Sequence, residues 1–336
     1  MAIPLVPPPP LPPELIRWTI RTPTVADAGA MYALAAAAEQ ASVGTTMITR
    51  SEIEQGLTSA SALSESATVL VEHDGDLVCA PSIMQVHPDH FVGELQVHPS
   101  VSRADGDRIT GWGLDWFERL ALALDPLPGR IQLGQWSFEA DTERARRLRA
   151  HGYEADRQFL RMTRDLPAGE QWPEPAAGVV VRPARVRRDD PEFGDARLVH
   201  ELITTSFADH YNYQASPFES WFAHRTDDAG YDPAMWLIAE LDGRPLGAMI
   251  MNRELAEHEA GYVHYIGVLR EGRGRGVAKA LLYSGFALCR DSGYRTVKLF
   301  VDADSPTGAT ALYESIGMTR EVVTIDWQKW LVTTAS

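Results

Sequence analysis

The chain has 336 residues, of which 45% are hydrophobic and 23% are charged. This length suits one large or two medium domains, and the apolar fraction excludes a wholly disordered chain. With 31 Lys and Arg against 46 Asp and Glu, the net charge of −15 argues against a protein whose main work is binding nucleic acid or an anionic membrane.

The N-terminal segment, residues 1–13, is rich in proline, which favours a stiff polyproline II tail. It has neither the basic start nor the unbroken apolar core of a signal peptide. The sequence contains no run of about 18 apolar residues, so it predicts no membrane-spanning helix. The two cysteines, Cys79 and Cys289, form no metal-ligand spacing and no disulfide framework. We therefore expect a cytoplasmic protein without a metal site.

The first half of the chain begins with an extended run at residues 16–23 and an alanine-rich helix at 25–41. A pair of strands at 67–81 then turns at Asp74-Gly75, a dipeptide typical of β-hairpins. Five further elements follow in the first half: a strand ending in a loop, a long helix, another strand, a short helix ending in glycine and a last strand.

The second half repeats this order of elements. It has a strand at 179–184, a helix at 195–208 and a strand pair at 235–251, again with an Asp-Gly turn. Corresponding positions such as Gly152 and Gly317 lie about 165 residues apart, which indicates one tandem duplication.

A proline- and glycine-rich linker at residues 165–178 separates the halves. We therefore predict domains at residues 14–164 and 179–336. The mixture of hairpins and strand–helix–strand units predicts an α/β (α+β) fold with mostly antiparallel sheets.

The segment at 268–282, VLREGRGRGVAKALL, carries the clearest chemical signal. Three glycines, Gly272, Gly274 and Gly276, alternate with Arg273 and Arg275 just before an amphipathic helix. Glycine allows a ligand close to the backbone, and free N–H groups at a helix start favour phosphate. The expected ligand is a pyrophosphate or a phosphorylated cofactor, although neither the Walker A nor the Rossmann pattern is present.

A second motif lies at 301–318, VDADSPTGATALYESIGM. Together the two segments resemble the GCN5-related N-acetyltransferase (GNAT) family, whose acetyl-CoA motif is Arg/Gln-x-x-Gly-x-Gly/Ala and whose late signature is Leu-Tyr before Gly-Phe or Gly-Met. The matching residues are Arg273, Gly276, Ala278, Leu312, Tyr313, Gly317 and Met318.

This resemblance covers about residues 179–331, and the first half resembles the family only in layout. It implies two tandem GNAT-like domains, each with a mixed, mostly antiparallel sheet, flanking helices and a splayed central strand pair. It also implies an acetyl-CoA site formed by the end of the strand, the glycine-rich loop and a serine where the family often has asparagine. These residues are Ile266, Gly267, Val268, Arg273, Gly274, Arg275, Gly276, Val277, Ala278, Lys279 and Ser305.

The resemblance assigns Tyr313 the role of assisting the departing thiolate. Its alternative is a structural tyrosine on an amphipathic helix. The base that deprotonates the amine is open between His264, Glu259 and solvent, with Glu257 as a further candidate. Tandem mycothiol synthases have a Glu at the position of Tyr262, so the catalytic role of that Glu cannot be assigned to this residue.

The aromatic and acidic segment 207–236 corresponds to the acceptor wall of the family. Tyr211, Trp221 and Tyr262 are the candidate substrate residues, with core packing as the alternative. Such a wall suits a cationic amine. The first half lacks the Arg-x-x-Gly-x-Gly/Ala pattern and has Asp105 and Asp107 there, so we expect it to be degenerate.

The sequence thus predicts an acetyl-CoA-dependent N-acetyltransferase that acts by direct attack of a small-molecule primary amine. The alternatives are an antibiotic or protein N-acetyltransferase, a mycothiol synthase-like enzyme, an aminoacyl-tRNA-dependent transferase, and an acyl-CoA-binding scaffold or sensor. A monomer or homodimer without nucleic-acid or membrane partners is expected.

Overall fold

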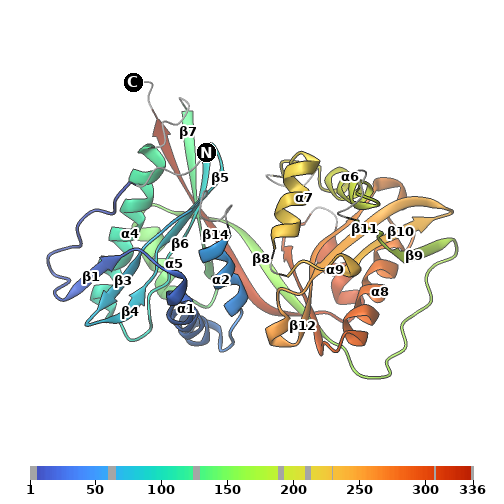
Figure 1. The fold of residues 1–336 in the computed structure, drawn as a ribbon, viewed down its shortest axis with the longest axis horizontal. Coiled ribbons are helices and arrows are strands. Elements are labelled where there is room, and N and C mark those ends of the chain that lie inside the picture. Colours follow the sequence, from blue (N-terminus) through green and yellow to red (C-terminus); the bar gives the residue numbers. More distant parts are fainter. Residues whose placement is uncertain are drawn as a thin grey trace. The chain divides into compact units, whose positions relative to one another are not determined.

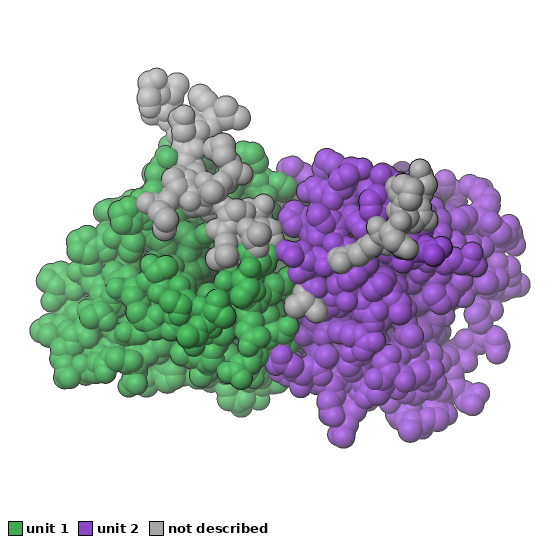
Figure 2. All heavy atoms as spheres, viewed as in Figure 1, with its two compact units in different colours: residues 1–159, 322–336 green, residues 160–321 purple. Residues whose placement is uncertain are grey.

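The computed structural model describes residues 6–59, 66–123, 129–187, 193–208, 213–228, 230–305 and 308–333. The chain divides into two compact units, residues 1–159 with 322–336, and residues 160–321 (Figure 2). The α/β class predicted from the sequence is confirmed (Figure 1). No helix of the described ranges is both long and apolar enough to cross a membrane.

The division differs from the predicted linear boundaries because the chain's last strand belongs largely to the first unit. Strand β14 (Thr319–Thr333) pairs antiparallel with β7 (Gly129–Phe138) over ten residues, from Thr324 opposite Phe138 to Thr333 opposite Gly129. The first unit also ends inside a strand, after Phe159, rather than at the linker. Hydrogen bonding between segments distant in sequence therefore sets the boundary.

The first unit contains a three-stranded sheet in the order β1-β3-β4 and a larger sheet in the order β2-β5-β6-β7-β14. Its remaining elements, in chain order, are β1 (Trp18–Arg21), α1 (Ala28–Val43), α2 (Arg50–Thr58), β2 (Ser66–Thr68), β3 (Leu70–His73), β4 (Asp76–Cys79), β5 (Ser82–His87), β6 (His90–Glu94), α4 (Arg103–Ala123), α5 (Thr142–Ala150) and the start of β8 (Glu154–Asp165).

The second unit has one sheet in the order β8-β13-β12-β11-β10-β9. Its elements are β9 (Val179–Pro183), α6 (Ala196–Phe207), α7 (Phe218–Asp227), β10 (Trp236–Leu241), β11 (Arg244–Asn252), β12 (Ala260–Val268), α8 (Val277–Asp291), β13 (Thr296–Asp302) and α9 (Ala309–Ser315).

The two predicted Asp-Gly hairpins are present, one in each unit. Asp74 and Gly75 have φ of 56° and 91°, and Asp242 and Gly243 have φ of 52° and 76°. Two successive residues with positive φ match the right-handed twist of the strands that they join, β3–β4 and β10–β11. Local sequence was therefore sufficient to predict both turns.

Helices cover both faces of the second unit's sheet (Figure 1). Helices α6 and α7 share a buried cluster with Ala248 and Ile250 of β11. Helix α8 lies on the other face, because a Cβ added at Gly247 would meet Val277 at 3.0 Å and Leu281 at 3.2 Å. This sandwich holds β11 and β12, the strands that carry the candidate site.

Candidate active site

The central feature of the site is a strand that loses one neighbour. Strands β12 and β13 pair in parallel from Ala260 opposite Thr296 to Val263 opposite Leu299. Beyond that point β12 continues to Val268 and, among the described strands, pairs only with β11. Backbone groups normally find hydrogen-bond partners, so the open side of residues 264–268 can receive an extended ligand. The predicted arm-binding residues Ile266, Gly267 and Val268 lie in this stretch.

A β-bulge occurs where the strands separate. On β11, Ile250 and Met251 are consecutive, but their partners on β12 are Tyr265 and Val263, so His264 is the extra residue. Bulges next to functional sites redirect side chains. Here His264 is the first β12 residue past the last β12–β13 pair.

The bulge also changes which face the following residues occupy. A Cβ added at Gly261 would lie 2.1 Å from Cys289 Sγ of α8, whereas one at Gly267 would lie 1.9 Å from Ser206 Oγ of α6. Residues six apart in a regular strand share a face, yet these two face helices on opposite sides. Glycine at 267 therefore allows α6 to approach the opened strand.

The glycine-rich loop leads from β12 into α8. Gly274 has φ of 73°, and Gly276, the residue before the helix, has φ of 83°. The first turn of α8 has no acidic residue, so its free N–H groups and the helix dipole suit an anion. Arg273 Nε donates to the carbonyl oxygen of Val268 at 3.2 Å and fixes the loop on the strand end.

The remaining predicted loop residues occupy the same turn. Arg275 forms an exposed ion pair of 3.4 Å with Asp242 of the hairpin turn, where salt and solvent weaken it. Val277, Ala278 and Lys279 are the first residues of α8. The structure therefore brings the predicted pyrophosphate residues together at one helix start.

Tyr313 lies on α9, a short helix that packs on β13. The side chain is 6% exposed, and burial raises the pKa of Tyr313 to about 12. The hydroxyl therefore keeps its proton at neutral pH and can donate it. Ser305 follows β13, and its backbone N–H donates to Asp302 O at 3.1 Å.

His264 is held in one protonation state by Arg225 of α7. The Arg225 guanidinium donates a hydrogen bond to His264 Nε2. Arginine is only a donor, so Nε2 accepts and the ring proton of the neutral imidazole is on Nδ1. Burial and the Arg225 charge lower the pKa of His264 to about 3. The ring is therefore neutral at physiological pH, and its Nε2 lone pair is already used.

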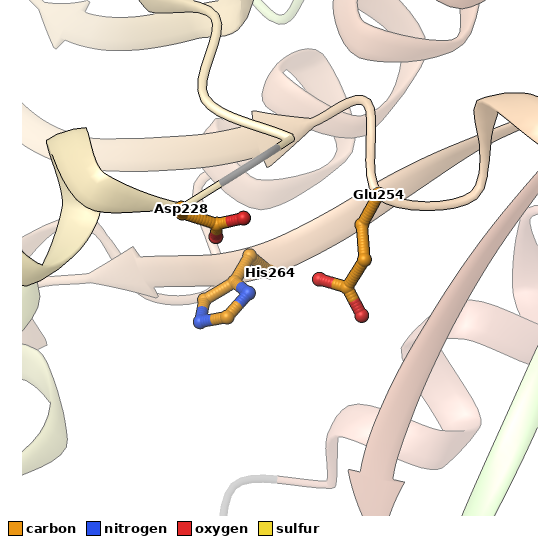
Figure 3. A group of neighbouring side chains, drawn as sticks. All are labelled: Asp228, Glu254 and His264. Carbon is orange, nitrogen blue, oxygen red and sulfur yellow. The ribbon is translucent and has the colours of Figure 1, made fainter. Parts of the chain in front are cut away.

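Two carboxylates lie on the other side of this ring (Figure 3). The nearest donor atoms of Asp228, Glu254 and His264 all lie within 4.8 Å of one another. Asn252, which is 4% exposed, joins the acids through hydrogen bonds of 3.4 Å to Asp228 and 3.1 Å to Glu254. The buried His264 Nδ1 has no hydrogen-bond partner among the described residues and is turned toward the carboxylates.

The charge of this cluster suits a monovalent cation. Two carboxylates and the Arg225 guanidinium give a formal sum of −1, and the guanidinium already occupies one ring nitrogen. A substrate ammonium balances that charge better than a divalent metal ion does.

Sequence reasoning missed Arg225, Asn252 and Glu254, and it noted Asp228 only as one of several acids, because no local motif links these separate segments.

The alternative bases lie elsewhere. Glu259 is exposed and forms a 3.1 Å ion pair with Arg295. It precedes β12 and is five residues from His264, about 16 Å along an extended strand. Glu257 is also exposed. The structure therefore does not bring either glutamate to the cluster around His264.

The candidate acceptor residues have different surroundings. The ring of Tyr262 lies 5.8 Å from that of His264, so it borders the cluster. Trp221 is 8% exposed and packs edge-on against Trp236 at 5.6 Å in the core under α7, as the core-packing alternative expects. Tyr211 lies outside the described residues.

Comparisons with known proteins agree with this geometry. The model of the Acetyltransferase (GNAT) family matches residues 197–318. A mycothiol acetyltransferase of Thermobispora bispora is 32% identical over 269 residues, which are 78% of this chain and 84% of that protein.

Solved structures share the fold over nearly the whole chain. A GCN5-related N-acetyltransferase from Sphaerobacter thermophilus has a TM-score of 0.79 at 26% identity and covers 97% of this chain and 98% of its own. A tandem GNAT protein from the clavulanic acid biosynthesis pathway has a TM-score of 0.69 at 16% identity, and the match covers 95% of this chain and 100% of that protein. The predicted duplication of the fold is thereby confirmed.

Replacing Gly276 by valine should abolish binding at the loop while the fold persists. A valine at φ of 83° is strained, and its Cβ would lie 2.9 Å from that of Ala176. The helix N–H groups would then be displaced, and each hydrogen bond to a charged phosphate contributes about 1.5–3 kcal/mol. We expect acetyl-CoA affinity, measured by calorimetry, to fall about 100-fold or more.

Gly75→Val is the matched control, because Gly75 has φ of 91° in an open hairpin turn of the first unit. It should leave acetyl-CoA affinity unchanged. Equal affinities for the parent and Gly276→Val would contradict the assignment of the loop. Binding of two acetyl-CoA molecules per chain with similar affinity would contradict a degenerate first unit.

Replacing Arg225 by glutamine should raise the pKa of His264. The variant keeps a donor group but removes the positive charge, one of the two causes that lower this pKa. The midpoint, followed by NMR of the imidazole protons, should move up by roughly one unit or more. A titration identical to the parent's would show that burial alone sets the protonation state.

Proposed function

The chain belongs to the GNAT family of acetyltransferases, and from this premise we propose that it transfers the acetyl group of acetyl-CoA to the primary amine of a small cationic acceptor. The protein is an acyltransferase of a family that uses acyl-CoA. The choice of acetyl-CoA and of an amine is the proposal, and it rests on the site's chemistry.

The observation that carries it is the anionic cluster where β12 parts from β13. Asp228 and Glu254 offer oxygen atoms within 4.8 Å of a ring nitrogen of His264. An ammonium group between them gains charge-assisted hydrogen bonds in a partly buried site. That position adjoins the strand whose open side suits the acyl arm, so an amine held there would be close to the thioester.

The proposed reaction begins with a proton transfer from the bound ammonium to a carboxylate of the cluster, directly or through water. The freed amine lone pair attacks the thioester carbonyl carbon, and a C–N bond forms. The tetrahedral intermediate then breaks its C–S bond, and Tyr313 donates its proton to the departing thiolate. The amide nitrogen loses its second proton to solvent. The protonated carboxylate then returns its proton to the Tyr313 phenolate through water, so charge and atoms balance and both groups regain their starting states.

In this scheme His264 positions the reacting groups and does not accept the proton of the amine. Its Nε2 lone pair receives a hydrogen bond from Arg225, so it is not available for the amine proton. Its Nδ1–H faces the carboxylates and can donate to one of them, to water or to a polar atom of the acceptor. This replaces the direct-base role that the sequence left open for His264.

A second candidate acceptor follows from the relatives. Proteins named mycothiol acetyltransferase match 78% of this chain in one case and 71% in another, both at 32% identity. This similarity favours their acceptor. Tyr262 argues against it, since the resemblance to tandem mycothiol synthases implies a glutamate at that position.

A panel of amines with acetyl-CoA, followed by release of free thiol, tests the proposal. A primary amine that is protonated in solution should react, and Glu254→Gln should raise the KM for that amine about tenfold, since one charge-assisted hydrogen bond is weakened. Glu259→Gln is the matched control and should behave as the parent. No thiol release with any amine, or equal KM values for Glu254→Gln and the parent, would overturn the amine assignment.

Tyr313→Phe should lower kcat while acetyl-CoA affinity stays the same. The hydroxyl matters most when charge develops on sulfur, and loss of a positioned proton donor costs about 10²–10⁴-fold. Tyr294→Phe is the control, because Tyr294 is a 9% exposed tyrosine of the same unit whose hydroxyl contacts Arg253. A Tyr313→Phe enzyme as fast as the parent would assign Tyr313 a structural role.

A further inference from the structure

The first unit has its own opened strand pair, and a cavity lies beside it. Strands β6 and β7 pair in parallel from His90 opposite Gln132 to Val92 opposite Gly134. The chain then leaves β7, and Val97 bridges to Cys79 instead. A cavity of about 570 Å³ is lined by residues 95–99, by α4 and by the start of α5. This volume is within the usual range for small-molecule sites.

Two buried polar side chains of the cavity wall have no hydrogen-bond partner within the part of the chain that the structure describes. Gln135 of β7 is 3% exposed, and neither its Oε1 nor its Nε2 makes a hydrogen bond. Thr110 of α4 is 4% exposed, and its Oγ1 is also without a partner. Both residues line the cavity. Buried polar groups are nearly always hydrogen-bonded, and leaving one unpaired costs about 1–3 kcal/mol, so these atoms indicate a polar ligand.

Arg144 adds a positive charge to the same wall, which the nearby acids Glu94 and Asp141 offset in part. Its Nη2 is buried without a partner, and among the described residues its guanidinium forms no ion pair; it lies 5.2 Å from the Trp136 ring. The other two arginines of the wall are paired. Arg103 contacts Glu143 at 3.1 Å, and Arg147 contacts Asp107 at 2.8 Å.

Glu94 and Asp141 favour the charged form of Arg144, but among the described residues neither forms an ion pair with its guanidinium. Asp141 accepts the backbone N–H of Arg144 at 2.9 Å as the cap of α5, and it also accepts from Ser42 at 3.3 Å. Glu94 accepts from Gln96 at 2.9 Å, and burial raises the pKa of Glu94. A buried guanidinium is costly unless an anion contacts it.

The helix that begins at this cavity is closed to a diphosphate. Ser102 Oγ accepts the N–H of Asp105 at 3.1 Å and donates to the Asp105 carboxylate at 2.8 Å, so the first turn of α4 is capped by its own side chains. That turn carries an acidic residue, in contrast to the first turn of α8. A negative charge there repels phosphate.

We propose that this cavity binds a small organic monocarboxylate. The carboxylate contacts Arg144 and receives hydrogen bonds from Gln135 Nε2 and Thr110 Oγ1. Its apolar body packs against Leu95, Val97 and Leu114, which line the rest of the wall. The site would be separate from acyl transfer, because all its residues belong to the first unit.

Calorimetry on the full chain with acetate, butyrate, hexanoate and benzoate tests the proposal, with hexanamide as the uncharged control. At least one carboxylate should bind once per chain, and hexanamide should bind about tenfold more weakly than hexanoate. Arg144→Gln should weaken carboxylate binding about tenfold or more, whereas Arg119→Gln, an exposed arginine of α4 outside the cavity, should not. A cooperative thermal unfolding transition of the first unit like the parent's would show that Arg144→Gln is folded.

Thr110→Val separates a ligand-binding role from a structural one. It removes a buried hydroxyl without a partner, so the melting temperature should rise or stay constant while carboxylate affinity falls several-fold. Three outcomes would overturn the proposal: no carboxylate of the series binds, Arg144→Gln binds as the parent does, or a second acetyl-CoA binds per chain and is lost in Arg144→Gln.

Discussion

The candidate site depends on the separation of β12 from β13 after Val263. Beyond that pair, the backbone of β12 has one partner strand in the described part of the chain, so the polar groups on its other side can bind a ligand or water. The surrounding contacts keep the strand open rather than collapsed. Gly267 lets α6 pack closely from one face, and Arg273 fixes the strand end through the Val268 carbonyl. The glycine-rich loop then turns directly into α8, so the open strand and the helix start form one continuous surface.

Charge decides what the side chains at this opening can do. Arg225 occupies one nitrogen of His264 and keeps the ring neutral, with burial as the larger cause. The ring proton is then directed to the side of Asp228 and Glu254. A histidine that looks like a general base in the sequence becomes a hydrogen-bond donor in the structure. The acidic pair beside the ring supplies the negative charge that suits a substrate cation.

Both units contain a pair of parallel strands that separates part-way along its length, but they differ at the start of the helix that follows. In each, a parallel strand pair opens after three or four residues, next to the long helix that follows. In the second unit, glycine with positive φ precedes a helix whose first turn lacks acids. In the first unit, Ser102 and Asp105 close that turn, and Arg144, Gln135 and Thr110 form the polar part of a separate cavity. Duplication therefore preserved the opening while its chemistry diverged.

The sequence alone determined the features that depend on short-range conformation. The Asp-Gly hairpins follow from residues that adopt positive φ, and the glycine-rich helix start follows from the spacing of Gly274 and Gly276. Only the tertiary structure decided the bulge at His264, because a bulge is a relation between two strands and changes the face of every residue after it. The same holds for β14, whose pairing with β7 joins segments almost 200 residues apart. It also holds for the cluster of Arg225, Asp228, Glu254 and His264, whose members come from a helix, a strand and the loops beside them. Such contacts are fixed by packing across the fold, and no local pattern of residue types encodes them.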